Sequence, residues 1–276
     1  MLRNYLKIAL RTLWKNKLFS LVNILGLGLA IPFALLALLH LQAAFEFDNF
    51  HPHSDRIYRI ITDEKSSDGG GIKYASSPYL LSERLRNNYA CVEKATGVVR
   101  DFGWELSNQL KTFQVNTIYV SPDFFGIFGF RLEKGTLPVE PNSLVLSHEA
   151  AEKFFGKNDP VGQTLEHPTY GVFTITGVLK PYKKETQFRS DVMVSVATFE
   201  KYHTEASGGQ SWGDYNTHTF VRLHPTARPE ALDQAIGEVA KKTNPTLSQA
   251  KKSNIFHKQV LADISPGRDE LRYNPY

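Results

Sequence analysis

The longest apolar stretch of the chain lies near its N-terminus. No charged residue occurs between positions 18 and 45, and nearly every residue from 19 to 41 is apolar. At a rise of about 1.5 Å per residue, such a helix can cross a hydrocarbon core of roughly 30 Å with some tilt. We therefore expect one membrane-spanning helix over residues 18–45, followed by a folded domain over residues 46–265.

The segment before this span, residues 1–17, has a periodicity of its own. Basic residues recur every four positions, at Arg3, Lys7, Arg11 and Lys15. Beside them runs an apolar stripe, which is typical of an amphipathic helix in the headgroup layer, where these bases and Lys17 would contact the membrane surface. A basic stop-transfer flank with chance periodicity is the alternative.

The charges around the span predict its orientation. Five bases and no acid precede it, and the first charges after it are the acids Glu46, Asp48 and Asp55. The positive-inside rule then places the N-terminus in the cytoplasm and the domain on the outer side of the membrane. A cleaved signal peptide is disfavoured, because its apolar region runs to only about 7 to 15 residues.

Small residues lie near the middle of the span. Gly26, Gly28 and Ala30 are followed by Pro32, which we expect to kink the helix locally. Close packing against a second membrane helix is one interpretation of the small residues. The other is the general abundance of glycine and proline in membrane helices.

Beyond the span, strand and helix patterns alternate. One predicted β-α-β unit has a strand at 56–62, a helix opened by Pro78 and a strand at 93–100. A second has a strand at 217–223, a helix opened by Pro229 and a strand at 255–263. Two such units can share one sheet.

The segment between these units is predicted to be rich in short strands. Strands are expected at 112–120, 143–146, 171–179 and 192–196, and brief helices at 122–128 and 147–155. Ser147 is the expected N-cap of the second of these helices, and Gly156 its C-terminal stop. The fold class is thus α+β: a discontinuous α/β domain built from the two β-α-β units, with a β-rich insert.

Charge and cysteine content exclude some classes of protein. The net charge of +4 comes from the membrane flank, since the residues after position 45 hold 27 bases and 28 acids. Without a basic stripe interleaved with aromatics, the domain does not suggest a nucleic-acid surface. Its single cysteine, Cys91, cannot form an internal disulfide.

Signals of catalysis are weak. Residues 209–213 match G-x-S-x-G around Ser211, but a nucleophile elbow must join a strand to a helix, and a Gly/Ser-rich loop is expected here. No phosphate-binding G-x-x-x-x-G-K-[ST] loop occurs, so any energy from ATP must come from another polypeptide. We predict no catalytic residue, no cofactor site and no enzymatic activity.

The histidines do not form a metal-binding motif either. His51 and His53, with Asp55, have the right ligand types but lack the spacing of a zinc site, so a turn around Pro52 is expected. The other histidines considered are scattered and expected at the surface: His148, His167, His203, His218, His224 and His257.

Several segments resemble one family. Residues 2–13 (LRNYLKIALRTL), 15–20 (KNKLFS) and 23–27 (NILGL) are similar to the N-terminus of MacB-like, FtsX-type ABC transporter permeases. Residues 120–125 (VSPDFF), 144–147 (LVLS), 153–156 (KFFG), 159–162 (DPVG) and 175–178 (ITGV) resemble the periplasmic core domain of that family. The resemblance covers nearly the whole chain.

This resemblance implies the permease half of a type VII ABC system. A cytoplasmic partner ATPase would open and close a permease homodimer or heterodimer, and the periplasmic domains would act in efflux or mechanotransmission on a periplasmic client or adaptor. The domain would consist of a porter-like part, residues 46–111 and 217–265, and a sabre-like insert, residues 112–216.

The chain departs from the family pattern in one respect. Family permeases carry further membrane helices after the periplasmic domain, whereas no second run here approaches 18 apolar residues. We therefore expect a truncated permease or a fragment, in which residues 266–276 lead toward an absent helix. Alternatives are a membrane-anchored extracytoplasmic binding or sensor domain and an anchored hydrolase that uses Ser211.

Overall fold

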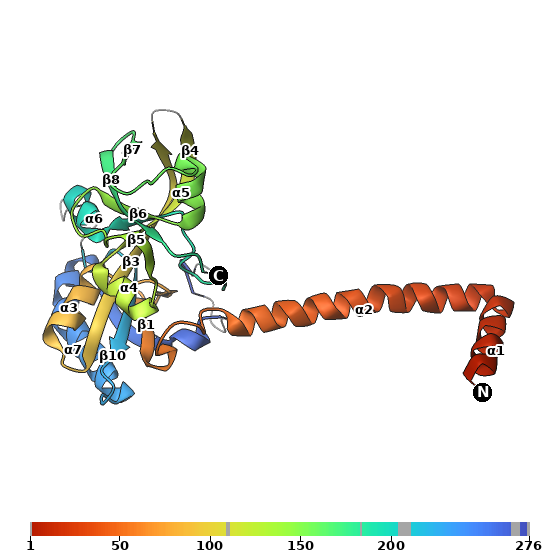
Figure 1. Ribbon diagram of the computed structural model, residues 1–276. Coiled ribbons are helices and arrows are strands. Elements are labelled where there is room, and N and C mark those ends of the chain that lie inside the picture. Colours follow the sequence, from red (N-terminus) through yellow and green to blue (C-terminus); the bar gives the residue numbers. More distant parts are fainter. Residues whose placement is uncertain (1, 109–110, 183, 204–210, 266–270, 275–276) are drawn as a thin grey trace. The chain divides into compact units, whose positions relative to one another are not determined.

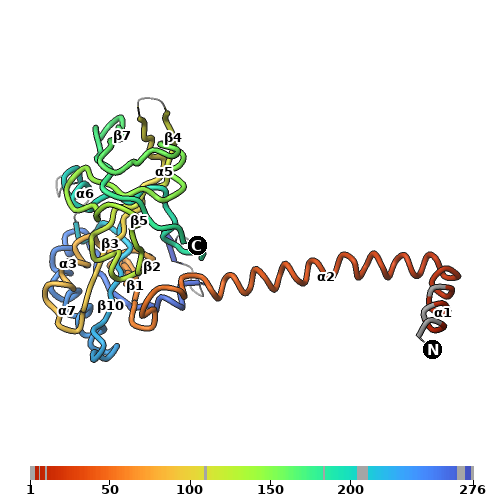
Figure 2. Tube along the Cα trace, viewed as in Figure 1, coloured from red at the N-terminus to blue at the C-terminus, as the bar shows by residue number. Residues whose placement is uncertain are grey.

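The computed structural model describes residues 2–108, 111–182, 184–203, 211–265 and 271–274, apart from the side chains of Leu2, Arg3, Leu6 and Leu10. It contains two compact units, Met1–Glu46 and Phe47–Tyr276, which are considered separately below. Figure 2 traces the chain through both units.

The N-terminal unit consists of two helices, α1 (Leu2–Lys15) and α2 (Lys17–Glu46). They separate at Asn16, and the hydroxyl of Ser20 donates a hydrogen bond to the carbonyl of Leu13 (3.0 Å), which satisfies a backbone acceptor at the end of α1. Among the described residues, α2 is the one helix long and apolar enough to cross a membrane, with a mean hydropathy of 2.3 over its most apolar 18 residues. This agrees with the single span predicted from the sequence.

The larger unit contains one sheet, and four of its strands form a recognisable motif. This motif consists of two β-α-β units. The first is β1 (Ile57–Ser66), α3 (Leu80–Asn88) and β3 (Val92–Ser107), and the second is β10 (Thr217–Leu223), α7 (Pro229–Leu247) and β11 (Lys252–Val260). The spatial order is β11-β1-β10-β3 with every neighbouring pair antiparallel, so β1 runs parallel to β3 and β10 parallel to β11. Each β-α-β unit therefore straddles a strand of the other, as in a ferredoxin-like split β-α-β fold, and the expectation that the two units share one sheet is confirmed.

The remaining strands extend the same sheet beyond β3. They are β2 (Gly71–Tyr74), β4 (Thr112–Val120), β5 (Leu132–Gly135), β6 (Ser143–Leu146), β7 (Thr164–His167), β8 (Gly171–Leu179) and β9 (Val192–Ser195). The order continues from β3 as β4-β9-β6-β8-β5, while β2 pairs with β1, and β7 pairs with β3 and β8. The accompanying helices are α4 (Pro122–Phe128), α5 (His148–Phe155) and α6 (Val196–Tyr202), with short 3-10 turns at Ser54–Arg56, Ser248–Ala250 and Leu261–Asp263.

Three hydrophobic clusters stabilise this unit. Helices α3 and α7 cover one face of β1, β10 and β3, with Leu81, Leu85 and Ile236 buried against the strands (Figure 1). The phenylalanines of α4 form a second cluster with β10 and the segment around Phe188. The third cluster lies among β4, β6, β8, α5 and α6. Burial of this much apolar area supplies the main driving force for folding in a domain without disulfides.

Most predicted boundaries agree with the structure. Strands β4, β6, β8 and β10 and helix α4 span the predicted residues, and the hydroxyl of Ser147 accepts a hydrogen bond from the Ala150 amide (3.1 Å) as an N-cap. Gly156 ends α5 at a φ of 62°, a conformation that favours glycine. The prediction for β11 was displaced: the strand begins at Lys252, and residues 261–263 form a 3-10 turn instead.

Candidate functional site

The small residues of the span, Gly26, Gly28 and Ala30, are all exposed on α2. Apart from each glycine, its two chain neighbours and the adjacent backbone of α2, no atom of the described chain lies within 4 Å of the position that a Cβ would take at either glycine. Nothing within this chain therefore requires glycine at these positions. The close approach of another helix remains a prediction.

The basic residues of α1 are exposed on the same unit. Lys7, Arg11 and Lys15 are exposed, as is Lys17, whose ammonium lies 5.8 Å from the centroid of the Trp14 ring. The side chain of Arg3 lies outside the described residues. Trp14 itself is 71% exposed, so α1 presents an aromatic side chain as well as bases to its surroundings. Contact of these side chains with a membrane surface stays a prediction.

A cluster of buried polar side chains lies at the start of the larger unit. We call Asp48, His51, Thr186 and Gln187 the junction cluster. His51 Nδ1 donates to the carbonyl of Phe128 (2.8 Å), and its Nε2 lies 3.1 Å from Asp48 Oδ1 and 3.3 Å from the Thr186 hydroxyl. Gln187 donates to both carboxylate oxygens of Asp48, through its backbone amide (3.3 Å) and its side-chain amide (2.6 Å). These contacts join the carboxylate of Asp48 and the imidazole of His51 in one buried hydrogen-bond network.

The junction cluster is enclosed by aromatic rings. Asp48 and His51 are 2% and 3% exposed. The His51 ring lies 5.1 to 5.8 Å from the rings of Phe128, Phe130 and Phe188, centroid to centroid. Asp48 also adopts a φ of 58°, which is uncommon for a residue other than glycine. Because the polar groups satisfy one another inside an apolar shell, the segment directly after α2 is held firmly to α4 and to residues 185–188.

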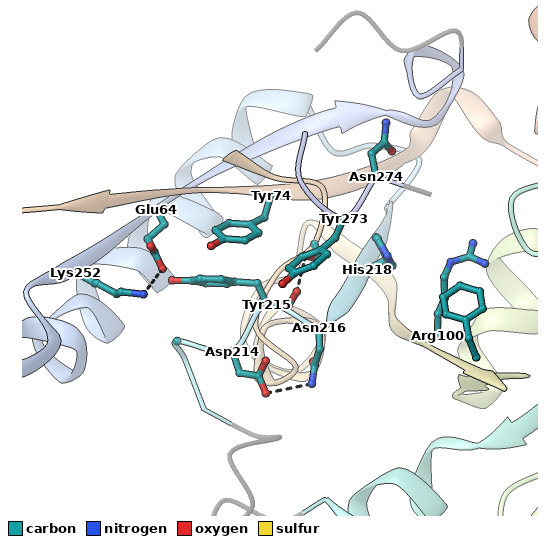
Figure 3. A pocket seen from close by; sticks show the side chains of 13 residues that line it. Glu64, Tyr74, Arg100, Asp214, Tyr215, Asn216, His218, Lys252, Tyr273 and Asn274 are labelled. Atoms are coloured by element: carbon teal, nitrogen blue, oxygen red, sulfur yellow. Dashed lines mark hydrogen bonds and ion pairs between the residues drawn. The ribbon is translucent and has the colours of Figure 1, made fainter. Parts of the chain in front are cut away.

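The larger unit also has a cleft of about 560 Å³ beside β2 and the start of β10 (Figure 3). We call it the tyrosine cleft, because Tyr74, Tyr215 and Tyr273 line it together. The ring of Tyr74 lies 4.6 Å from that of Tyr215 and 5.7 Å from that of Tyr273. Tyr74 and Tyr215 are 7% exposed, whereas Tyr273 is 58% exposed.

The segment that contributes Tyr273 pairs with β2. The amide of Ala75 donates to the Arg272 carbonyl and the amide of Arg272 to the Lys73 carbonyl, both at 2.9 Å. The buried guanidinium of Arg59 donates to the Asn274 side chain (3.1 Å), so both ends of this short segment are fixed.

The ionisable groups of the tyrosine cleft differ in whether a partner of opposite charge lies beside them. Glu64 pairs with the Lys252 ammonium at 2.9 Å. Asp214 is half-buried, and burial raises the pKa of its carboxyl. Burial, together with the positive charges of Arg100 and Arg59, lowers the pKa of His218 to about 3, so its ring is neutral near pH 7.

Comparison with known proteins identifies the family. The model of the MacB-like periplasmic core domain matches residues 20–239, most of the chain. The chain belongs to the MacB-like periplasmic core domain family. This family forms part of ABC transporter permeases, and together with the apolar helix it indicates a membrane-anchored protein. No curated protein matches the chain by sequence.

Solved structures with the same fold come from permeases and transporters. A domain described as part of a permease from Porphyromonas gingivalis is 21% identical, with a TM-score of 0.66 over 76% of this chain and 91% of that one. The extracellular domain of the ABC-type transporter YknZ from Gram-positive bacteria is 13% identical, with a TM-score of 0.52 over 72% of this chain and 99% of that one. At these identities, the likeness establishes the MacB-like fold and not a shared substrate.

Within this MacB-like domain the weak catalytic candidates do not assemble. Ser211 is exposed and is followed by a turn and then by β10, not by the helix of a nucleophile elbow; Gly209 and Gln210 lie outside the described residues. His51 is hydrogen-bonded within the junction cluster. The described residues contain no group of three or more His, Cys, Asp or Glu side chains that could hold a metal ion. The turn expected around Pro52 is present.

The expectation that the remaining histidines lie at the surface was wrong at two positions. His218 is buried against the tyrosine cleft and bonded to the Ala75 carbonyl (3.3 Å). His167 is 8% exposed, and its Nδ1 accepts from the amides of Thr169 and Tyr170, both at 3.1 Å, which orders the turn between β7 and β8. The contacts that cover these rings include residues distant along the chain, Ala75 for His218 and Trp104 for His167, so a local sequence pattern does not signal their burial.

Proposed function

We propose that this chain is a permease subunit of an ABC transporter, in which ATP hydrolysis by a cytoplasmic partner moves a periplasmic domain through α2. The chain itself would not be catalytic. The domain would act on a client or adaptor in export or mechanotransmission, in a homodimer or heterodimer of permeases in the inner membrane. The four-stranded split β-α-β part would correspond to the porter, and strands β4 to β9 to the sabre-like insert.

The observation that carries this proposal is the junction cluster. A helix can transmit displacement to a domain only if the connecting segment does not yield first. Asp48, two residues after α2 ends, accepts hydrogen bonds from Gln187, and His51 bonds to α4. Directional bonds inside an apolar shell support such transmission, whereas a loose linker would dissipate it.

A topology experiment tests the orientation. Five bases before the apolar span of residues 18–45 and acids after it predict that a reporter active only outside the inner membrane works when fused after Tyr276. External protease should also remove the domain from spheroplasts. Activity of a cytoplasmic reporter alone would contradict both the orientation and the permease role.

A second experiment separates the permease from the membrane-anchored sensor. In membranes that contain the partner ATPase, hydrogen exchange of the amides at 47–51 and 185–188 should change when ATP is added, because the junction cluster would carry the displacement. A partner ATPase unable to hydrolyse ATP serves as the control. Exchange that never responds to ATP would favour the sensor.

A further inference from the structure

Two aromatic side chains of the tyrosine cleft are held in solvent by unusual backbone conformations. Phe102 is 73% exposed at a β-bulge, where β3 has one residue more than β4 between the pairs Asp101–Thr117 and Trp104–Val115. The adjoining Gly103 has a φ of 80°. Tyr273 is 58% exposed and itself has a φ of 59°. Bulges commonly redirect a side chain, and strained residues gather at binding sites, so the exposure of these two rings requires an explanation.

The cleft also contains a carboxylate that has no countercharge among the described residues. Asp214 is half-buried; within the described part of the chain its side chain accepts one hydrogen bond, from the Asn216 amide (3.2 Å), and forms no ion pair. The other charged groups of the lining are engaged: Lys252 with Glu64, and Arg100 with the carbonyl of Gln187. Figure 3 places Asp214 between these groups, apart from Arg100 at one end and Lys252 at the other.

The rings of the cleft already bind a cation from the chain itself. The guanidinium carbon of Arg272 lies 5.4 Å from the centroid of the Tyr273 ring and 6.0 Å from that of Tyr74. Aromatic faces attract guanidinium and ammonium groups through the quadrupole of the ring. The local chemistry therefore suits a positively charged group next to an aromatic surface.

We infer that the tyrosine cleft binds a cationic group on an aliphatic stem, an alkylguanidinium or alkylammonium ion, with its charge at Asp214 and its stem along Tyr273 toward Phe102. A cation would supply the countercharge that Asp214 lacks, and the stem would cover apolar surface that now faces water. The same chemistry is presented by a small amine and by an arginine or lysine side chain of a peptide. This ligand site goes beyond the proposed transport function.

Binding of matched probes to the full-length chain in nanodiscs tests the inference. The probes are butylguanidinium and its neutral analogue butylurea, titrated by ligand-observed NMR. Because a charge-assisted hydrogen bond is about twice as strong as a neutral one, butylguanidinium should bind at least about tenfold more tightly. Asp214→Asn, which removes the charge and keeps the shape, should reduce this preference to about twofold or less.

Variants of the aromatic residues should affect both probes. Tyr273→Asn removes the ring but tolerates the positive φ, and Phe102→Leu removes the second ring; each should weaken both probes several-fold. Asp159→Asn, at an exposed carboxylate paired with Lys134, is the matched control and should change nothing. Thermal unfolding of each variant confirms that the domain is intact.

A blocked pentapeptide with one central arginine among glycines and serines identifies the source of the cation. Tighter binding than butylguanidinium indicates a peptide ligand, and equal or weaker binding a small amine. The inference is overturned if neither cation binds saturably, if butylurea binds as well, or if Asp214→Asn keeps the preference. Selective binding of butyrate that is lost in Arg100→Gln would also overturn it, because the cleft would then be an anion site.

Discussion

Replacing His51 by phenylalanine tests whether the junction cluster holds the domain together. The substitution keeps an aromatic ring among Phe128, Phe130 and Phe188 but removes the bond to the Phe128 carbonyl and the contact with Asp48. Removing one partner of a buried pair typically costs about 3–5 kcal/mol. We expect the lower end, about 3 kcal/mol, because Gln187 still donates two hydrogen bonds to Asp48.

The predicted loss is large enough to measure easily. A change of 1 kcal/mol shifts the melting temperature of a domain of this size by roughly 2–4 °C, so the Tm of His51→Phe should fall by about 6–12 °C. Tryptophan fluorescence during thermal and urea unfolding of the detergent-solubilised chain provides the assay. The same substitution at the exposed His257 on β11, His257→Phe, is the control and should stay within about 0.5 kcal/mol.

A double-mutant cycle distinguishes the polar interaction from packing. In Asp48→Asn/His51→Phe no charge is left buried, so the double variant should lose at least about 1 kcal/mol less than the sum of the two single losses. If His51→Phe costs less than about 1 kcal/mol, or if the two substitutions are additive, the junction cluster does not contribute as argued.

Three further results are expected. Gly26→Leu should leave membrane insertion intact, because it adds bulk without polarity in open space, but should reduce association of the permease in membrane cross-linking. Ser211→Ala should alter stability by no more than about 0.5 kcal/mol, and appearance of a serine-dependent esterase activity in the parent chain would reverse this interpretation. Because the pKa of His218 is lowered from 6.5 to about 3 in the folded chain, protonation favours unfolding between these values; the free energy of unfolding should fall with decreasing pH by up to about 1.4 kcal/mol per unit, and less steeply in His218→Gln.

The sequence predicts those elements whose pattern is local. Strands β4, β8 and β10 are long enough to display alternation, and α7 begins with a proline at its first turn and repeats apolar residues on one face. Strands β2, β5 and β7 have four residues each, too few for a periodic signal, and they lack the continuous apolar run that marks the equally short β6 and β9. They exist because a neighbouring strand pairs with them. The prediction for β3 stopped at Arg100 because the bulge next to that residue interrupts the alternation, although the strand continues to Ser107.

The junction cluster and the tyrosine cleft could not be predicted from sequence patterns, because their residues come from distant parts of the chain. In the junction cluster, His51 and Thr186 are 135 positions apart, and Phe128 is 77 positions from His51. The motif around Pro52 predicts a turn but not the partners of that turn. The tyrosine cleft likewise joins Tyr74, Tyr215 and Tyr273 from three separate segments. The signal that was available, a histidine and a proline shortly after an apolar span, is too general to bring these residues together.

In the proposed permease role, the polarity of the junction cluster would favour transmission of movement. An apolar contact is non-directional, so packed surfaces can slide by a fraction of a side chain at little cost. The bonds from His51 to Phe128 and from Gln187 to Asp48 have fixed geometry, and breaking one leaves a buried polar group unsatisfied at about 1–3 kcal/mol. A displacement of residues 47–51 must therefore carry α4 and residues 185–188 with it, since separating them costs more than moving them together. Because α4 packs against β10 and the segment 185–188 leads into β9, such a displacement would reach both the four-stranded motif and the strands beyond β3.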